Sequence, residues 1–401
     1  MDYLLNSPLE IGKIRLENRV CFQPMEGCDC NSDGTPSELT RAKYTRAAKS
    51  GAGLIWFEAC AVCPEGRTNE GQLMITRENL SVFKNFVAEL KATAKVECGI
   101  EPIFILQLTH SGRQSIVPMI AYRHPIYEER RPVTDDNIVS DEYLDTLPRK
   151  YADAALLAIE AGFDGVDVKS CHGYLFQELL SAFSREGRYG GSFENRTRLY
   201  LDSVRAVKAA VPADYPVVMR LSVADMVPYP YGFGTTAENE LDFTEPDMLL
   251  ERLIEAGILM LNVTIGNPYY NPHINRPYRL GSYKAPEAAE VGLERFRIVE
   301  KHIKEKFPTL VVVGSGLSYY RADLIERSEE LLKDGICDLV GYGRCWLAYP
   351  EFYRDFLNGE FSAKKCCVAC SKCTALMRAK CVSGCSVFND HYKKLYEEKV
   401  K

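Results

Sequence analysis

Long hydrophobic runs are missing from the 401-residue sequence, and so is any excess of positive charge. No window approaches the roughly 18 uninterrupted apolar residues of a membrane-spanning helix, and the first residues lack the basic and apolar regions of a secretory signal. Lysine and arginine number 49 against 55 aspartates and glutamates, a formal net charge of −6. Because nucleic acid and anionic membranes attract basic proteins, we expect neither partner, and predict a cytoplasmic enzyme acting on a small molecule.

Low-complexity linkers are also missing, so the chain offers few places at which to divide it. Hydrophobic residues make up 46% of the sequence, enough for a large buried core. The composition changes abruptly only after residue 358, where cysteine and lysine become frequent. We therefore predict a first domain over residues 1–361 and a Cys-rich segment over residues 362–401.

Short β-branched or apolar runs alternate with longer helical stretches. The candidate strands are residues 20–24, 54–57, 103–106, 165–168, 217–221, 260–264, 310–313 and 339–341. The candidate helices are residues 78–96, 147–161, 198–211, 245–256, 286–306 and 319–333. Glycine often stands between a helix and the next strand, as expected for a left-handed helix stop. Eight strand–helix units predict the α/β class and a (β/α)8 TIM barrel, with a doubly wound open sheet as the alternative.

Glycine and arginine follow the last two predicted strands. Gly314 and Gly316 end the seventh strand, and Gly343 and Arg344 end the eighth. In barrels these neighbouring ends commonly hold a phosphate, because glycine lets backbone N–H groups approach its oxygens and arginine adds a charged fork. The plainer alternative is two tight turns with a surface arginine.

Polar side chains also end the third, fourth and fifth strands. Gln107 and Arg220 are suited to face a planar hydrogen-bonding ring such as a flavin, although each can equally cap a loop. Lys169, His172 and Tyr174 fall within six residues and can polarise a carbonyl and deliver a proton. Lys169 is alternatively a Schiff-base nucleophile, or a salt-bridging lysine beside a packed tyrosine.

Six of the fifteen cysteines crowd between Cys366 and Cys385. In a long chain without an export signal, such clustering favours metal binding over disulfides. The predicted thiolate ligands of an iron–sulfur cubane are Cys367, Cys370, Cys373 and Cys385. Cys381 is the alternative fourth ligand, Cys366 is an extra thiol, and zinc is the rival metal.

Taken together, these motifs resemble the Old Yellow Enzyme family, in particular its iron–sulfur branch, which includes 2,4-dienoyl-CoA reductase and trimethylamine dehydrogenase. The similarity runs over nearly the whole chain: LENRVCFQPMEG, ILQLTHSGR, DGVDVKSCHGYLFQELLS, VVVGSGLS and LVGYGRCWLAYPEF each resemble a family segment. The most specific is SREGRYGGSFENRTR, which resembles the family pattern NxRxDxYGGSxENRxR.

The resemblance implies FMN bound at the top of the barrel and a cluster of the [4Fe-4S] type. The implied FMN contacts are Pro24, Met25, Cys60, Gln107 and Arg220, with the phosphate on Gly316, Gly343 and Arg344. The family binds and protonates α,β-unsaturated carbonyl compounds with two His or His/Asn side chains and a tyrosine. His172 and Tyr174 match the second and third of these positions, whereas Lys169 stands where histidine is usual, a longer and normally charged donor.

The implied activity is an ene-reductase that transfers hydride to the β-carbon while Tyr174 protonates the α-carbon. Its iron–sulfur relatives continue into FAD- and nicotinamide-binding domains, whereas this sequence stops at Lys401 and has no GxGxxG fingerprint. We therefore expect either direct reduction by NAD(P)H or, preferably, a separate electron-transfer protein that feeds the cluster. A homo-oligomer is compatible with the sequence.

Three other functions stay open. An amine or alcohol dehydrogenase would send electrons outward through the cluster. A flavin-free lyase would use Lys169 as a Schiff base, and a non-catalytic binding protein would have a zinc-stabilised tail. Visible absorbance of flavin and cluster separates the first from the other two.

Overall fold

A computed structural model describes residues 3–281 and 283–400. In this part of the chain eight parallel strands form a closed barrel: β3 (Val20–Phe22), β4 (Leu54–Ala61), β6 (Ile103–Thr109), β7 (Gly165–Val168), β8 (Val217–Ser222), β9 (Met260–Thr264), β10 (Val311–Gly314) and β11 (Leu339–Tyr342). The barrel closes because β3 pairs with both β4 and β11. Each strand overlaps one predicted from the sequence, so the TIM barrel is confirmed and the open sheet is wrong.

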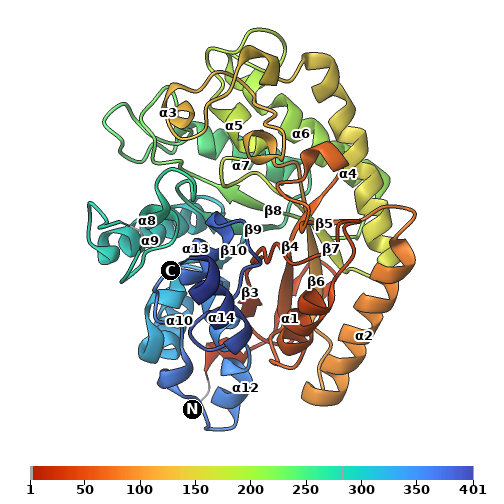
Figure 1. The fold of residues 1–401 in the computed structure, drawn as a ribbon, viewed down its shortest axis with the longest axis vertical. Helices are drawn as coiled ribbons and strands as arrows, with labels where there is room; N and C mark the ends of the chain where they lie inside the picture. The colour runs from red at the N-terminus through yellow and green to blue at the C-terminus, as the bar shows by residue number, and fades with distance from the viewer. Residues whose placement is uncertain (1–2, 282, 401) are drawn as a thin grey trace.

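Helices cover the outside of the barrel (Figure 1). The longer ones are α1 (Glu38–Ala48), α2 (Leu80–Cys98), α4 (Asp141–Ala161), α6 (Phe193–Ala210), α7 (Thr244–Glu255), α9 (Ala289–Lys306) and α10 (Leu324–Lys333). Both α2 and α4 end at a glycine in the left-handed region, Gly99 at φ +71° and Gly162 at φ +94°. These stops return the chain to the next strand as the sequence pattern predicted.

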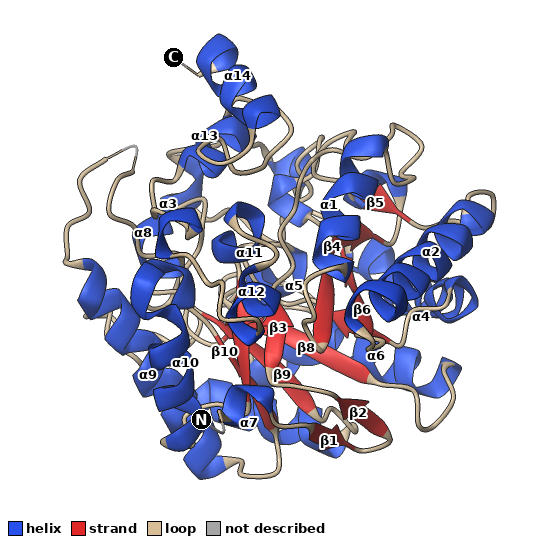
Figure 2. Cartoon of the chain, turned by 90° about the horizontal axis from the view of Figure 1, so that it is seen from below, coloured by secondary structure: helices blue, strands red, loops and turns tan. Residues whose placement is uncertain are grey.

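A short hairpin closes the N-terminal end of the barrel. It pairs β1 (Leu9–Ile11) with β2 (Ile14–Leu16), and both strands are seen from below in Figure 2. Ile11 and Leu16 pack against the interior side chains Trp56, Ile105 and Met260, which lie near the starts of their strands. With that end plugged by hydrophobic residues, the opposite end is left for polar chemistry.

The Cys-rich segment packs against loops at this opposite end. It contains α13 (Lys372–Arg378) and α14 (Asp390–Lys399). The backbone N–H of Ser383 donates to the Gly27 carbonyl at 2.6 Å, and the N–H groups of Arg279 and Leu280 donate to Ala369 at 3.0 and 3.2 Å. The segment is therefore tied to two loops of the barrel, one after β3 and one after β9.

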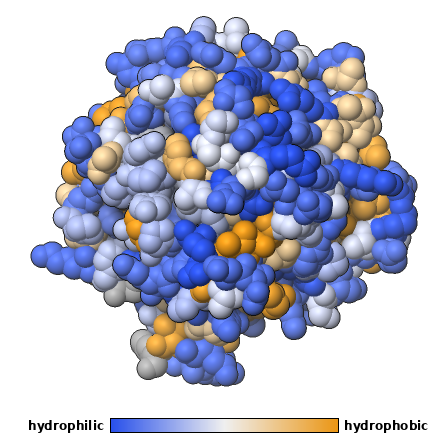
Figure 3. Space-filling view, turned by 90° about the horizontal axis from the view of Figure 1, so that it is seen from above, coloured by the Kyte–Doolittle hydropathy of each residue, from blue (hydrophilic) through white to orange (hydrophobic). Residues whose placement is uncertain are grey.

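The exterior is mainly hydrophilic on the face seen from above, with hydrophobic residues scattered among polar ones (Figure 3). Among the helices that the structure describes, none combines the length and the apolar character needed to cross a membrane.

Asp225, just after β8, is a buried carboxyl group from which we predict a pH effect on stability. It accepts a hydrogen bond from the Phe233 N–H at 3.1 Å and another from the Gln177 amide. Burial raises its pKa from 3.8 to about 8. The folded protein thus holds a proton that the unfolded chain releases, and this stability is present at low pH and lost as pH rises towards 8.

We expect Asp225→Asn to remove this pH dependence, which amounts to about 1.4 kcal/mol per pH unit between the two pKa values. Urea unfolding at pH 5, 6 and 7 gives the free energy of unfolding of wild type and variant. The change with pH in the difference between these two free energies measures the effect. Asp136→Asn, at an exposed aspartate, is the control and should leave the wild-type slope intact. A parallel pH dependence in wild type and Asp225→Asn would show that Asp225 is ionised throughout this range.

Candidate active site and cysteine-lined cavity

Two strand ends meet the loop that follows β3, one through the Arg220 side chain and one through Gly343. Arg220 on β8 donates from Nη1 to the Pro24 carbonyl at 3.3 Å. Met25 lies beside Gly343, with its Sδ 3.3 Å from where a Cβ on that glycine would stand. Both Arg220 and Arg344 are buried, and the Nε of the first and the Nη1 of the second have no hydrogen-bond partner. Because buried N–H groups are normally paired, these atoms fit a polar, negatively charged group at this end of the barrel.

The predicted phosphate-binding turns lie on adjacent strands. Gly314 ends β10, Gly316 has φ +88°, and Gly343 precedes the short helix α11 (Arg344–Ala348). Arg344 is anchored by a 2.7 Å hydrogen bond from Nη2 to the Pro277 carbonyl. A guanidinium that is held through Nη2 while its Nη1 has no partner is suited to a phosphate, and phosphate binding here stays a prediction.

Gln107 and Cys60 lie on neighbouring strands but face opposite sides. The Gln107 Nε2 donates to Asp167 inside the barrel at 2.6 Å, and Asp167 also accepts from the Arg220 N–H at 2.8 Å. Ala59 is the register partner of Gln107 and so shares the interior face. The Cys60 side chain packs in the outer hydrophobic core, and burial raises the pKa of its thiol to about 12. Only the Cys60 backbone is therefore available to a cofactor in the barrel mouth.

The fourth-strand motif brings Lys169, His172 and Tyr174 together. The Lys169 Nζ lies 3.7 Å from the centre of the Tyr174 ring. Burial lowers the pKa of Lys169 and raises that of Tyr174 well above 10. Burial also lowers the pKa of His172 well below 6.5, helped by Arg220 and Lys169. At neutral pH the imidazole is therefore neutral and the tyrosine holds its proton.

His172 is held in an unusual backbone conformation, at φ +65°. Its Nε2 is buried without a hydrogen-bond partner. A non-glycine residue in this region is strained, and such strain is often found at functional sites. The neighbouring Gly173 N–H is fixed by the Gln177 side chain at 2.5 Å, which helps to hold the turn.

Glu26 is a site residue that the sequence analysis missed. It directly follows Met25, and its Oε2 accepts a hydrogen bond from the Tyr174 hydroxyl at 3.3 Å. Its other oxygen lies 3.4 Å from the Asn69 amide nitrogen. The signal for it was its place in PMEG, one residue after two predicted cofactor contacts.

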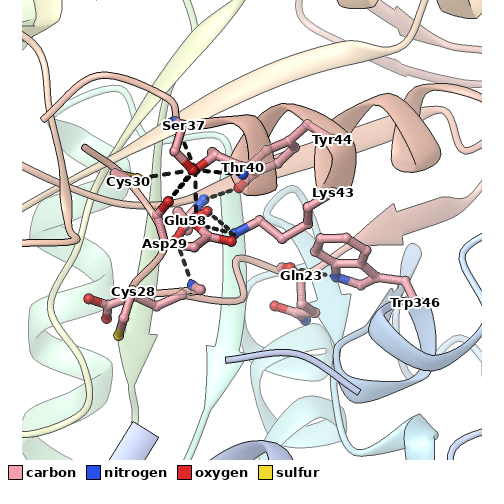
Figure 4. Close-up of polar contacts among 12 residues, drawn as sticks. Gln23, Cys28, Asp29, Cys30, Ser37, Thr40, Lys43, Tyr44, Glu58 and Trp346 are labelled. Carbon is pink, nitrogen blue, oxygen red and sulfur yellow. Dashed lines mark hydrogen bonds and ion pairs between the residues drawn. The ribbon is translucent and has the colours of Figure 1, made fainter. Parts of the chain in front are cut away.

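A buried ionic cluster holds the same loop in place (Figure 4). The Lys43 Nζ lies 3.1 Å from Asp29 and 2.5 Å from Glu58. Glu58 also accepts from the Gly27 N–H at 2.7 Å. Asp29, Cys30 and Glu58 have donor atoms close enough to hold a metal ion, but the lysine ammonium already bonds both carboxylates. The cluster therefore positions the loop rather than binding a cation.

We expect Lys43→Met to lower the free energy of unfolding by about 3–5 kcal/mol, because it leaves two buried carboxylates without their cation. Burial already raises the pKa of Glu58 to about 7, and Lys43 opposes that rise. Urea unfolding checks the effect. The control is Lys13→Met, which breaks an exposed ion pair with Asp214 and should cost less than about 1 kcal/mol. Equal losses in the two variants would contradict this role for the cluster.

Four predicted cysteine ligands line one small cavity. Cys367, Cys370, Cys373 and Cys385 face it together with Arg344. Among the described residues, no three of these sulfur atoms lie within 4.8 Å of one another. The Cys381 Sγ points to the Ala379 carbonyl and the Cys366 Sγ to that of Ser362, and neither cysteine lines the cavity.

The chain is similar to known oxidoreductases. A model described as the NADH:flavin oxidoreductase / NADH oxidase family matches residues 4–263. An NADH oxidase from Thermoanaerobacter brockii is 27% identical over 368 residues, covering 90% of this chain and 52% of that protein. An NADPH dehydrogenase from Listeria welshimeri is 28% identical over 362 residues, covering 88% and 93%.

Among solved structures, the complex of 2-naphthoyl-CoA reductase with 2-naphthoyl-CoA has a TM-score of 0.79 at 20% identity. The match covers 98% of this chain and 58% of that one, and supports the fold. The chain therefore spans about half the length of the NADH oxidase but nearly all of the NADPH dehydrogenase.

Proposed function

Because the chain belongs to the NADH:flavin oxidoreductase / NADH oxidase family of enzymes, we propose that it is an FMN-dependent ene-reductase. Family membership confirms the resemblance to Old Yellow Enzyme noted in the sequence. The proposed substrate is an α,β-unsaturated carbonyl or carboxyl compound. Bound FMN would supply a hydride to its β-carbon.

The proposal rests on one observation above the others: Lys169 lies over the ring of the buried Tyr174, and His172, whose Nε2 has no hydrogen-bond partner, belongs to the same segment after β7. Lys169 and His172 would donate hydrogen bonds to the substrate oxygen, which withdraws electrons from the double bond. Tyr174 would give its proton to the α-carbon. Arg220 would stabilise negative charge on the flavin ring, and Arg344 would hold the phosphate.

We also propose that Cys367, Cys370, Cys373 and Cys385 bind a [4Fe-4S] cluster. All four cysteines line one cavity, and the compact Cys-x2-Cys-x2-Cys run supports a cluster, with zinc as the rival metal. The hydrogen bond from Ser383 to Gly27 supports a relay, since it joins the Cys-rich segment to the loop of Pro24 and Met25. A separate electron-transfer protein would then reduce FMN through the cluster, with NAD(P)H as the alternative donor.

Anaerobic purification followed by visible spectroscopy and by iron and acid-labile sulfide assays tests these proposals. NADH, NADPH and then dithionite are added in sequence. Bleaching of the flavin by NADH or NADPH would show that the chain accepts electrons directly from a nicotinamide. Bleaching by dithionite alone would show that it needs an electron-transfer protein. Cyclohexenone, an unsaturated carboxylate and an enoyl thioester are then added to the reduced protein. Failure of all three to reoxidise the flavin would overturn the ene-reductase.

A further inference from the structure

The Glu26 carboxyl group contacts the hydroxyl group of Tyr174. The contact joins the Tyr174 oxygen to the Glu26 Oε2 at 3.3 Å. The Asn69 amide nitrogen lies 3.4 Å from the other Glu26 oxygen and 3.3 Å from the Cys28 Sγ. The carboxyl group is thus oriented by two side chains, one from the turn after β7 and one from the loop after β4.

Lys169 contacts Tyr174 on a different side. Its Nζ lies over the face of the ring, whereas Glu26 meets the hydroxyl at the ring edge. The Tyr174 oxygen is therefore bonded to a carboxyl group, and the lysine ammonium is directed at the π face. Of these two neighbours, the carboxyl group is the one aligned to exchange a proton with the phenol.

Burial of Glu26 favours the protonated form of its carboxyl group. Burial raises its pKa above 4.5, against the opposing effects of Lys169 and Lys43. The other titratable groups facing it are Tyr174, Tyr269 and Cys28, and burial raises the pKa of each of these as well. Burial thus favours the protonated Glu26 carboxyl group, and the two lysines favour release of its proton.

We propose that Glu26 is the proton store for Tyr174. This rests on the proposed ene-reductase function. The Tyr174 O–H bond breaks as its proton forms a C–H bond at the substrate α-carbon. The β-carbon receives a hydride, and thus both electrons, from reduced flavin. The resulting phenolate takes the proton of the Glu26 carboxylic acid, and solvent then restores Glu26. Each turnover consumes one hydride and one solvent proton.

The relay predicts a kinetic pattern for Glu26→Gln that loss of positioning alone does not give. The amide keeps the size and a hydrogen-bonding contact but has no acidic proton. The first reoxidation of reduced flavin by substrate should run near the wild-type rate, because Tyr174 still carries its own proton. Later turnovers should be slower by up to roughly 10²–10⁴-fold, the contribution of a positioned acid. Glu26→Asp should restore part of the later rate, and Glu238→Gln, at an exposed glutamate, should match wild type.

Rapid-mixing experiments over several turnovers at pH 6 to 9 measure the burst, with flavin content confirming that each variant is loaded. A second readout needs no turnover: ¹³C NMR of protein labelled at the glutamate carboxyl carbons, where the resonance missing from Glu26→Gln should titrate above pH 4.5. Equal first and later rates in Glu26→Gln, or a resonance that titrates at or below 4.5, would overturn the relay. If the wild-type protein reduces no unsaturated compound, the proposed ene-reductase function is overturned instead. The NMR titration of Glu26 then decides by itself whether this residue stores a proton.

Discussion

Tyr174→Phe is expected to leave flavin bound and to slow the reoxidation of reduced flavin by an unsaturated substrate roughly 10²–10⁴-fold. Only 2% of Tyr174 is exposed, so phenylalanine fills the same space and the barrel end keeps its shape. What is lost is the hydroxyl group, which burial keeps protonated at neutral pH. Reduction of the flavin needs no proton from Tyr174, and its rate should therefore stay near that of wild type.

Rapid mixing of the reduced protein with substrate measures this step apart from reduction. Tyr353→Phe is a matched control, because Tyr353 is also only 2% exposed but donates its hydroxyl to the Asn6 side chain, close to the start of the chain. It should lower stability without changing the half-reaction. An unchanged reoxidation rate in Tyr174→Phe would assign the proton to another donor or to water, and the role of Glu26 would fall with it.

The barrel could be predicted because its strands are short buried runs bounded by glycine. The predicted bounds of β7 and β9 match the structure, since all their residues are buried and the valine and leucine side chains of one face pack in the core. Helix α1 was not predicted. Its residues are largely polar, and its start is marked by a capping box of Ser37 and Thr40 rather than the usual Ser-x-x-Glu. The hairpin of β1 and β2 was missed because its strands are only three residues long.

Barrel enzymes carry their functional residues at the carboxyl ends of the strands, and this rule located much of the candidate site because all these ends lie on one rim. At this rim Arg220 contacts Pro24 and Gly343 lies beside Met25, although these residues lie far apart in sequence. The rule could not indicate which way Cys60 points. An irregularity in the pairing of β4 and β6 between Trp56 and Ala59 shifts the alternation of side chains.

Contacts made by loops could not be predicted from the sequence, for a different reason. Glu26 reaches Tyr174 across 148 positions of the chain, and only the path of the loop after β3 determines that contact. The same holds for Lys43, whose two carboxylate partners come from a loop and from β4. Each of these residues taken alone has the pattern of an ordinary surface charge.

Cys370→Ala is expected to remove the iron and acid-labile sulfide while FMN stays bound. The cavity is lined by four cysteines, and a cubane held by three thiolates lacks one of its protein ligands. The proposed flavin contacts come from the barrel strands and from the segments that follow them, and among these contacts only Arg344 lines the cavity with Cys370. Reduction of the flavin through an electron-transfer protein should therefore be lost, whereas any direct reduction by NAD(P)H should persist.

Cys366→Ala and Cys381→Ala are matched controls, because these thiols belong to the same segment but lie outside the cavity lining. Both should retain wild-type iron and sulfide, measured on anaerobically purified protein together with the visible spectrum. Loss of the cluster in Cys381→Ala but not in Cys385→Ala would make Cys381 the fourth ligand. Full iron and sulfide in Cys370→Ala would contradict the ligand set itself, because the central cysteine of the Cys-x2-Cys-x2-Cys run would then be dispensable.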